Sequence, residues 1–283
     1  MKFGIREVAD VMLKAKVDGQ KVGEKEFKKG QPVCHFDSLK TSTVEGAATT
    51  VYAMGGKGNP RLIAWEGERT LTLTMEDALI SKMGIAILTG AGLIDATSEE
   101  PVPVHFTETV VCKTQGELSV KYEVFNQDTT DTADIWIGVL DDEGNSTGEF
   151  IEGSLKDSST NVVTGENIVK GKGYIVDYYT KGTTGITEID IEPNKFGGNY
   201  YLEGSTLFRN TSGVDMPAEF IVPNCKIQSN FTFTMASSGD PSTFTYTVDA
   251  FPGVTKHNPA KKVLCAIYMV ETMPEEIKAD QGE

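Results

Sequence analysis

The chain has 283 residues, of which 39% are hydrophobic and 24% charged, a composition typical of a globular protein. No stretch approaches the ~18–20 consecutive apolar residues of a membrane span, and no apolar signal-peptide core follows the first residues, so we expect a cytosol-like compartment. Acidic residues number 41 against 26 basic ones, which gives a formal net charge of −15. Since neutralising nucleic-acid phosphates requires clustered Lys and Arg, this balance argues against DNA or RNA as a bound ligand.

The first hundred residues show strand-like alternation interrupted by turns. Apolar Val11, Leu13, Ala15 and Val17 alternate with more polar positions before Asp18-Gly19, which predicts a β-hairpin there. A helix through Val8 and Met12 is the less favoured alternative. Alternation also predicts strands at residues 33–36 and 70–74. Residues 49–60 are rich in glycine and end in proline, so we predict a long loop.

One amphipathic helix is predicted between the loop and the middle of the chain. Thr74 is placed to cap its N-terminus, Glu76 and Asp77 lie in the first turn, and Gly90 ends it. Its apolar residues fall on one face: Met75, Leu79, Ile80, Met83, Ile87 and Leu88. We expect this face to lie on a sheet.

The middle of the chain has a different composition. Residues 99–103, Glu-Glu-Pro-Val-Pro, look like a linker, and short strand-like runs separated by turns follow from residue 104 to about 180. The runs cover residues 105–111, 118–125, 133–140 and 173–179. This spacing predicts a small β-sandwich-like domain, which we interpret as an insertion over residues 101–184 between residues 1–100 and 185–283.

The last hundred residues are again strand-like. Strands are predicted at residues 186–191, 200–208 and 219–222. Residues 227–235 and 242–248 are then predicted to form a long hairpin, joined by the turn Ser238-Gly-Asp-Pro241. The acidic tail after Pro274 is expected to be frayed or bound to a partner.

No metal or disulfide pattern is present in the sequence. The cysteines lie far apart and share no Cys-x-x-Cys spacing, so we expect small buried apolar side chains: Cys34, Cys112, Cys225 and Cys265. The histidines are equally dispersed: His35, His105 and His257. We therefore predict no metal site and no cofactor.

Other motifs point to turns rather than to chemistry. Gly55-Gly-Lys-Gly58 lacks the spacing of a phosphate-binding loop and is followed by Asn59-Pro60, so we favour a flexible or interface loop. Asp141 and its acidic neighbours suggest calcium, but Gly144 falls too early for an EF-hand, and we favour a hairpin turn. No nucleophile elbow, dinucleotide fingerprint or carboxylate pair is present. We nominate no catalytic residue and predict that the chain is not an enzyme.

Several aromatic residues leave open, as an alternative, a carbohydrate-binding β-sandwich or an enzyme domain whose catalytic partner lies elsewhere. They are Trp65, Trp136, Tyr178, Tyr179, Tyr200 and Tyr201. Such rings provide stacking platforms when they are exposed. Because these residues lie in alternating strands, we favour packing in the core.

Six segments carry a resemblance to a known family. They are Arg6-Glu-Val-Ala-Asp10, Leu39-Lys-Thr-Ser-Thr-Val-Glu45, Thr50-Val-Tyr-Ala53, Gly58-Asn-Pro-Arg-Leu-Ile-Ala-Trp65, Met75-Glu-Asp-Ala-Leu-Ile-Ser81 and the stretch from Lys226 to Phe244. They resemble the tail tube subunits of phages that infect Gram-positive bacteria. The resemblance covers the first hundred and about the last hundred residues and is much weaker between them.

The resemblance implies a structural virion protein. Its fold would be mainly β, a β-sandwich or half-barrel with one flanking helix, and its subunits would form stacked hexameric rings around a DNA channel. Its partners would be further copies of itself, with the tail sheath and other tail proteins as further candidates. DNA would pass without specific binding, which an acidic chain favours because fewer cations hold the phosphates. A capsid-associated or neck protein is the alternative within the virion.

Overall fold

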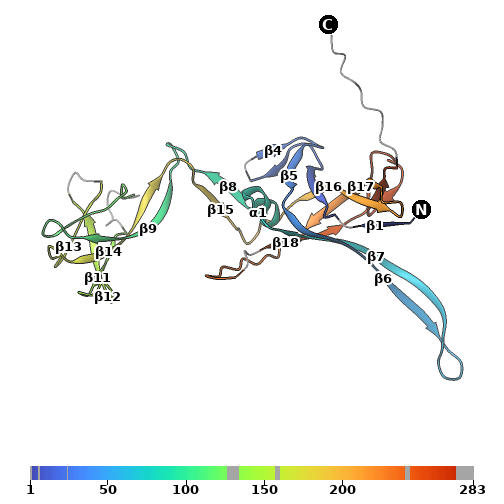
Figure 1. The fold of residues 1–283 in the computed structure, drawn as a ribbon, viewed down its shortest axis with the longest axis horizontal. Helices are drawn as coiled ribbons and strands as arrows, with labels where there is room; N and C mark the ends of the chain where they lie inside the picture. Colours follow the sequence, from blue (N-terminus) through green and yellow to red (C-terminus); the bar gives the residue numbers. More distant parts are fainter. Residues whose placement is uncertain are drawn as a thin grey trace, which may run out of the picture. The chain divides into compact units, whose positions relative to one another are not determined.

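The computed structural model describes residues 2–5, 7–23, 25–125, 134–156, 160–239 and 243–271. Strands dominate this part of the chain, and it contains one helix, which confirms the predicted mainly β fold (Figure 1). The residues group into two compact units. Unit 1 comprises Met1–Leu93 and Ile189–Glu283, and unit 2 comprises Ile94–Glu188. No helix among the described residues has the length and apolar character needed to cross a membrane.

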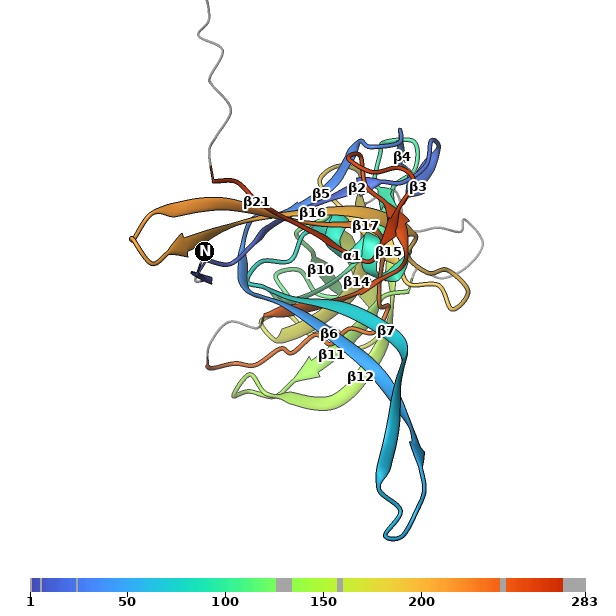
Figure 2. The same cartoon turned by 90° about the vertical axis from the view of Figure 1, so that its right-hand side faces the viewer.

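Unit 1 is built on one large antiparallel sheet. The strands of unit 1, in the sheet and outside it, are β1 (Phe3–Ile5), β2 (Asp10–Ala15), β3 (Gln20–Val22), β4 (Lys25–Phe27), β5 (Pro32–Phe36), β6 (Leu39–Met54), β7 (Arg61–Asp77), β16 (Asn199–Asn210), β17 (Asp215–Ile227), β18 (Phe244–Ala250), β19 (Gly253–Val254), β20 (Lys262–Val263) and β21 (Ala266–Met269). The sheet has nine strands in the order β5-β2-β16-β17-β18-β7-β6, with β1 also pairing with β16 and β21 with β17. The pairs β3–β4 and β19–β20 form small separate ribbons. The sheet therefore combines strands from the two ends of the chain (Figure 2).

Alternation produces the core of this unit, as the sequence predicts. Val11, Leu13 and Ala15 are buried on one side of β2, whereas Val17, the last residue of the predicted alternation, lies beyond the end of the strand and is exposed. The helix α1 (Lys82–Thr89) contributes Ala86 and Leu88 to the same apolar cluster. The helix thus covers the sheet, and Gly90 ends it in the left-handed conformation with φ of 70°.

Two predictions for the first hundred residues, the start of the helix and the hairpin at Gly19, are wrong. The helix begins at Lys82, with Ser81 as its N-cap, and Met75 to Asp77 instead complete strand β7. Met75 is fully buried there, and its pairing with Tyr246 of β18 outweighs the helical pattern. The predicted hairpin at Gly19 is also wrong, because β2 pairs with β5 and β16 while β3 pairs with β4.

The long hairpin of the chain lies at a different place from the predicted one. Residues 49–54, expected in a loop, belong to β6, which pairs with β7 along its length. Conversely, β17 ends at Ile227, and the described residues 228–239 form no strand. β17 and β18 pair over only three residues on each strand, and the predicted turn at Asp240 and Pro241 lies outside the described residues.

Unit 2 is a second all-β body with its own core. Its strands are β9 (Val102–Val111), β10 (Glu117–Ser119), β11 (Trp136–Leu140), β12 (Ser146–Leu155), β13 (Val162–Gly165) and β14 (Gly173–Gly182). They form one six-stranded sheet in the order β10-β13-β12-β11-β14-β9, and β12 takes part in both of its halves. Leu118, Ile137 and Val176 are buried among its strands. Of the predicted run at 118–125, only the first residues form a strand.

The chain passes between the units within two strands that pair with each other. They are β8 (Gly92–Asp95) and β15 (Thr187–Asp190). The pairing is extended by the backbone N–H of Ala96, which donates to the carbonyl of Ile186 at 2.9 Å. The predicted linker at residues 99–103 is therefore not the boundary, since β9 begins at Val102 and Pro103 lies opposite Lys181.

Candidate assembly surface

The distal halves of β6 and β7 form an arm that is paired only with itself. β7 pairs with β18 through residues 72–77, whereas residues 61–71 pair, among the described residues, with β6 alone. Figures 1 and 2 show this ribbon extending from the sheet of unit 1. We call residues 46–71 the arm. At its base, residues 46–48 and 69–71 share a hollow with residues 263–265. Further out, a two-stranded ribbon with no third strand or helix beside it is at best marginally stable in water.

One face of the arm is apolar and exposed. Val51 lies opposite Trp65, and Ala53 lies opposite Ile63. Directly opposed residues project to the same side of a ribbon, so these four side chains form one cluster, which we call the arm face. Trp65 is 54% exposed and Ile63 is 55% exposed. Large exposed apolar side chains clustered in this way mark a surface that another body covers.

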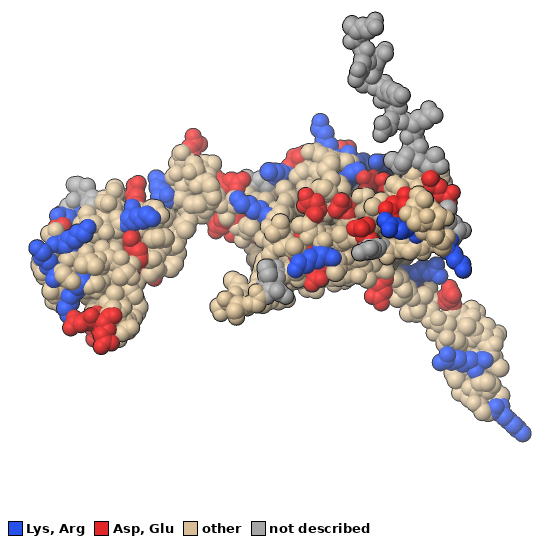
Figure 3. All heavy atoms as spheres, in the orientation of Figure 1, with Lys and Arg blue, Asp and Glu red and all other residues tan. Residues whose placement is uncertain are grey.

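Two of the charged side chains of the arm, Arg61 and Lys57, lie away from the arm face. Tyr52 projects from the opposite side, where the Arg61 guanidinium lies 4.0 Å from its ring centroid. Lys57 lies in the turn between the strands, where Gly56, Gly58 and Asn59 adopt positive φ. In Figure 3 the arm carries few charged atoms between its tip and the body of unit 1.

Unit 1 also carries an apolar hollow of about 310 Å³. Residues from several strands of the sheet line it, among them Val44 of β6, Leu73 of β7, Leu202 of β16, Phe220 of β17 and Ile267 of β21. The hollow lies on the sheet itself, at the base rather than the tip of β6 and β7. The same unit thus presents an apolar projection and an apolar depression.

Comparison with known proteins identifies the family. The model of the YomU/Tube protein family matches residues 3–263, which is nearly the whole chain. The chain belongs to this family. No curated protein matches it at a significant level. The family name, together with the β-rich fold, supports a structural protein of a phage tail, and the resemblance seen in the sequence is confirmed.

The glycine motif of this YomU/Tube protein forms the tip of the arm. Gly55-Gly-Lys-Gly58 connects the two strands, with the N–H of Gly55 donating to the carbonyl of Pro60 at 3.2 Å. No helix follows it, so its amides have no helix terminus to join in holding a phosphate. The interpretation as an interface loop stays a prediction.

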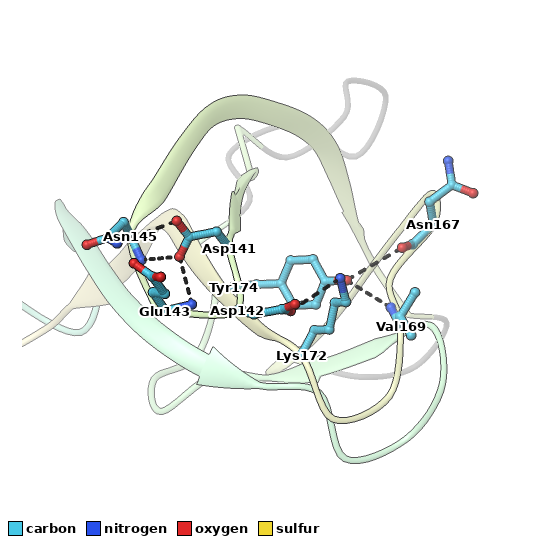
Figure 4. Close-up of polar contacts among 8 residues, drawn as sticks. All are labelled: Asp141, Asp142, Glu143, Asn145, Asn167, Val169, Lys172 and Tyr174. Carbon is cyan, nitrogen blue, oxygen red and sulfur yellow. Dashed lines mark hydrogen bonds and ion pairs between the residues drawn. The ribbon is translucent and has the colours of Figure 1, made fainter.

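The acidic segment at Asp141 is a turn between β11 and β12 (Figure 4). Asp141 Oδ1 accepts the backbone N–H groups of Glu143 at 3.0 Å and Asn145 at 2.8 Å. These bonds, chiefly the one from Asn145, lower the pKa of the Asp141 carboxyl. Among the described residues no three His, Cys, Asp or Glu side chains are grouped as metal ligands. The Asp141 carboxylate therefore stabilises the turn.

The remaining candidates are dispersed through both units. Cys34, Cys112 and Cys225 are buried as predicted, and Cys265 is partly buried. His105 Nε2 lies 2.7 Å from Asp177 Oδ1 on the surface of unit 2.

The prediction that the aromatic residues pack in the core is only partly right. Tyr178 and Tyr200 are buried, while Trp65, Trp136 and Tyr179 are exposed. Strand alternation does not by itself say which of the two faces is covered, which is why the sequence did not separate these groups.

Proposed function

We propose that this chain is the subunit of a phage tail tube, in which hexameric rings stack around a channel for DNA. The observation that carries the proposal is the arm, whose apolar face has no partner within the described part of its own chain. The protein would act by assembly and not by catalysis. Its place would be the virion tail, put together in the host cytoplasm.

The arm gains most from a partner that removes it from water. Burying apolar surface contributes roughly 25 cal/mol per Å², so covering Trp65 and Ile63 alone would favour association by several kcal/mol before the costs of ordering. The strand β6 also forms the edge of the sheet over sixteen residues, and a long unprotected edge favours pairing with another chain. Both features act in the same direction.

The arm face and the apolar hollow of about 310 Å³ favour a contact that repeats from one copy of the chain to the next. An arm on one copy and a hollow on the next are different patches, so their contact is heterologous. Heterologous contacts produce closed rings when the rotation between copies closes, and filaments when it does not. A tube of stacked rings needs closed contacts within each ring and open-ended contacts along the stack. The number of six subunits follows the resemblance to tail tube proteins.

A cationic hollow in unit 1 supports contacts between copies. This hollow, of about 470 Å³, is lined by five lysines: Lys14, Lys16, Lys29, Lys256 and Lys262. Lys14 and Lys256 both pair with the carboxylate of Glu203, and partial burial lowers the pKa of Lys16. In a chain with a net charge of −15, such a hollow favours an acidic segment of a neighbouring copy.

The same net charge favours passage of DNA over its retention. Each Lys or Arg that neutralises a phosphate adds binding free energy by releasing counterions. A subunit with 41 acidic and 26 basic residues offers few such contacts in a channel. Tail sheath and other tail proteins are the further partners that a tube of this kind would contact.

Electron microscopy of the purified protein at increasing concentration tests the proposal. We expect rings or hollow filaments, accompanied by a rise in mass in light scattering. Particles that remain monomeric at every protein and salt concentration would contradict it. Closed shells or portal-like rings without stacking would favour a capsid or neck protein instead.

A further inference from the structure

The outward face of the sheet of unit 2 carries exposed aromatic side chains. Along β14, Tyr174, Val176 and Tyr178 point into the core, so Ile175, Asp177 and Tyr179 point outward. The neighbouring strands show the same alternation, with Trp136 outward on β11 and Phe150 outward on β12. We call this the stacking face.

The three outward aromatic residues lie on one diagonal across the strands of the sheet. Trp136 is opposite Asp177 of β14 and opposite Glu152 of β12. β12 and β14 run in the same direction, because both are antiparallel to β11. Tyr179 lies two residues after Asp177 on β14, and Phe150 lies two residues before Glu152 on β12. The two rings therefore lie on opposite sides of the row Glu152–Trp136–Asp177. Diagonal neighbours on a sheet are about 7–8 Å apart, so Tyr179, Trp136 and Phe150 follow each other at equal steps across three strands.

Carboxylates lie between the rings. Asp177 and Glu152 flank Trp136 in the same cross-strand row. Asp177 is held in place by His105, whose ring also lies 5.5 Å from that of Tyr179. The Glu152 side chain makes no hydrogen bond or ion pair within the described residues. Its oxygens are therefore available as acceptors.

The stacking face is supported by a packed layer underneath. Ile137, Val176 and Tyr178, which alternate with the outward residues, are fully buried. Gly138 leaves room for the ring of Phe150, since a Cβ there would lie 3.3 Å from Phe150 Cε1. Because the backbone is fixed from below, the spacing of the rings is preorganised, which lowers the entropy cost of binding.

From this arrangement we infer that unit 2 binds a neutral polysaccharide along the diagonal Tyr179–Trp136–Phe150. The C–H faces of sugar rings would stack on the aromatic rings, and sugar hydroxyls would donate to Asp177 and Glu152. Hydrogen bonds from hydroxyls to carboxylates are short and strong. The row of equal steps suits a linear polymer better than a single sugar.

The charges of the stacking face disfavour other classes of partner. Among the described residues of β9, β11, β12 and β14, Lys181 at the end of β14 is the only Lys or Arg on the stacking face. An anionic polymer would therefore be repelled by Asp177 and Glu152. The core of a protein interface is depleted of Asp and Glu, whereas here the carboxylates lie at the centre. A neutral, hydroxyl-rich partner satisfies both the rings and the carboxylates.

Retention of the full chain by polysaccharides tests the inference. The probes are insoluble chitin and cellulose, together with native gels that contain a soluble neutral glucan. We expect at least one probe to retain the protein, and Trp136→Ala and Tyr179→Ala each to weaken retention about ten-fold. Asp177→Asn should weaken it less, because the amide still accepts one hydrogen bond. Phe150→Ser, at a side chain 60% exposed, is a second variant with little effect on folding.

Tyr122→Ala is the matched control. Tyr122 and Tyr179 are both 39% exposed, but Tyr122 packs on the inward side chain of Phe106. We expect Tyr122→Ala to be retained like the unmodified protein. Failure of every probe to retain the unmodified protein, or equal retention of the Trp136 and Phe150 variants, would overturn the inference. A loss of self-association instead of retention would identify a protein interface. Retention does not require assembly, so it can fail or succeed independently of the tube proposal.

Discussion

The hydroxyl oxygen of Tyr246 lies 2.5 Å from the position that a Cβ at Gly84 would occupy. Gly84 is in the first turn of α1, and Tyr246 is fully buried in β18. The helix approaches the sheet this closely because residue 84 has no side chain. Within the described residues the Tyr246 hydroxyl is buried without a hydrogen-bond partner.

Gly84→Ala should destabilise unit 1 by about 1–3 kcal/mol, because the added methyl overpacks a rigid contact. Tyr246→Phe removes the buried unpaired hydroxyl and should be neutral or stabilising. In the Tyr246→Phe background, Gly84→Ala should cost clearly less. Urea unfolding of the four proteins measures the coupling. Strictly additive costs would show that the two residues do not share this contact.

Stability should fall above about pH 9. Burial raises the pKa of the Cys34 thiol to about 11 and those of the Cys225 thiol and the Tyr200 phenol to about 12. The unfolded chain loses these protons first, so unfolding releases protons and the unfolding free energy decreases with rising pH. The slope is at most about 1.4 kcal/mol per pH unit for each group. Unfolding at pH 8, 9 and 10 measures it, and Cys225→Ala should flatten it.

The arm face should control assembly without controlling folding. Replacing Trp65 and Ile63 together by Ser removes its two largest side chains, and we expect the protein to remain folded but to lose higher assemblies. Both residues are exposed, so the substitution costs little stability within one chain. Light scattering and circular dichroism measure the two effects. Val169→Ser, at an exposed residue of unit 2, is the control, and an equal loss of assembly there would argue against the arm.

Local patterns predicted those elements whose conformation can be read from their own residues, without knowing which strands lie beside them. The alternation of Val11, Leu13 and Ala15 gives β2, and Gly90 ends the helix because its positive φ suits glycine. Burial of Cys225 follows from its place on the inward side of β17. In each case one short-range rule and the tertiary fold agree.

Pairing between distant strands decided the rest. The apolar spacing that suggests a helix from Met75 is overridden because β18, about 170 residues later, pairs with that segment. The arm was missed because Val51 and Trp65 are apolar yet exposed, so no burial pattern marks them in one chain. A surface made for another copy leaves little periodic signal in the sequence.

Unit 2 should be dispensable for assembly. Its apolar cluster shares no residue with that of unit 1, so removing it uncovers none of the buried side chains assigned to the unit 1 core. The hydrogen bond between Ala96 and Ile186 closes the paired strands β8 and β15 at the unit boundary. Replacing residues 97–185 by a two-residue Asn-Gly turn would therefore convert β8 and β15 into a short hairpin.

We expect this shortened protein to be soluble and to form rings or tubes of smaller outer diameter in electron micrographs. An insertion joined by adjacent ends can be removed at little cost, because the loop that closes the gap is short. The contrasting variant replaces arm residues 48–69 by the same turn, which should keep the fold of unit 1 but abolish assembly. If unit 2 were instead an integral layer of the tube, its removal would expose apolar surface, and the shortened protein would aggregate while the arm variant stayed soluble.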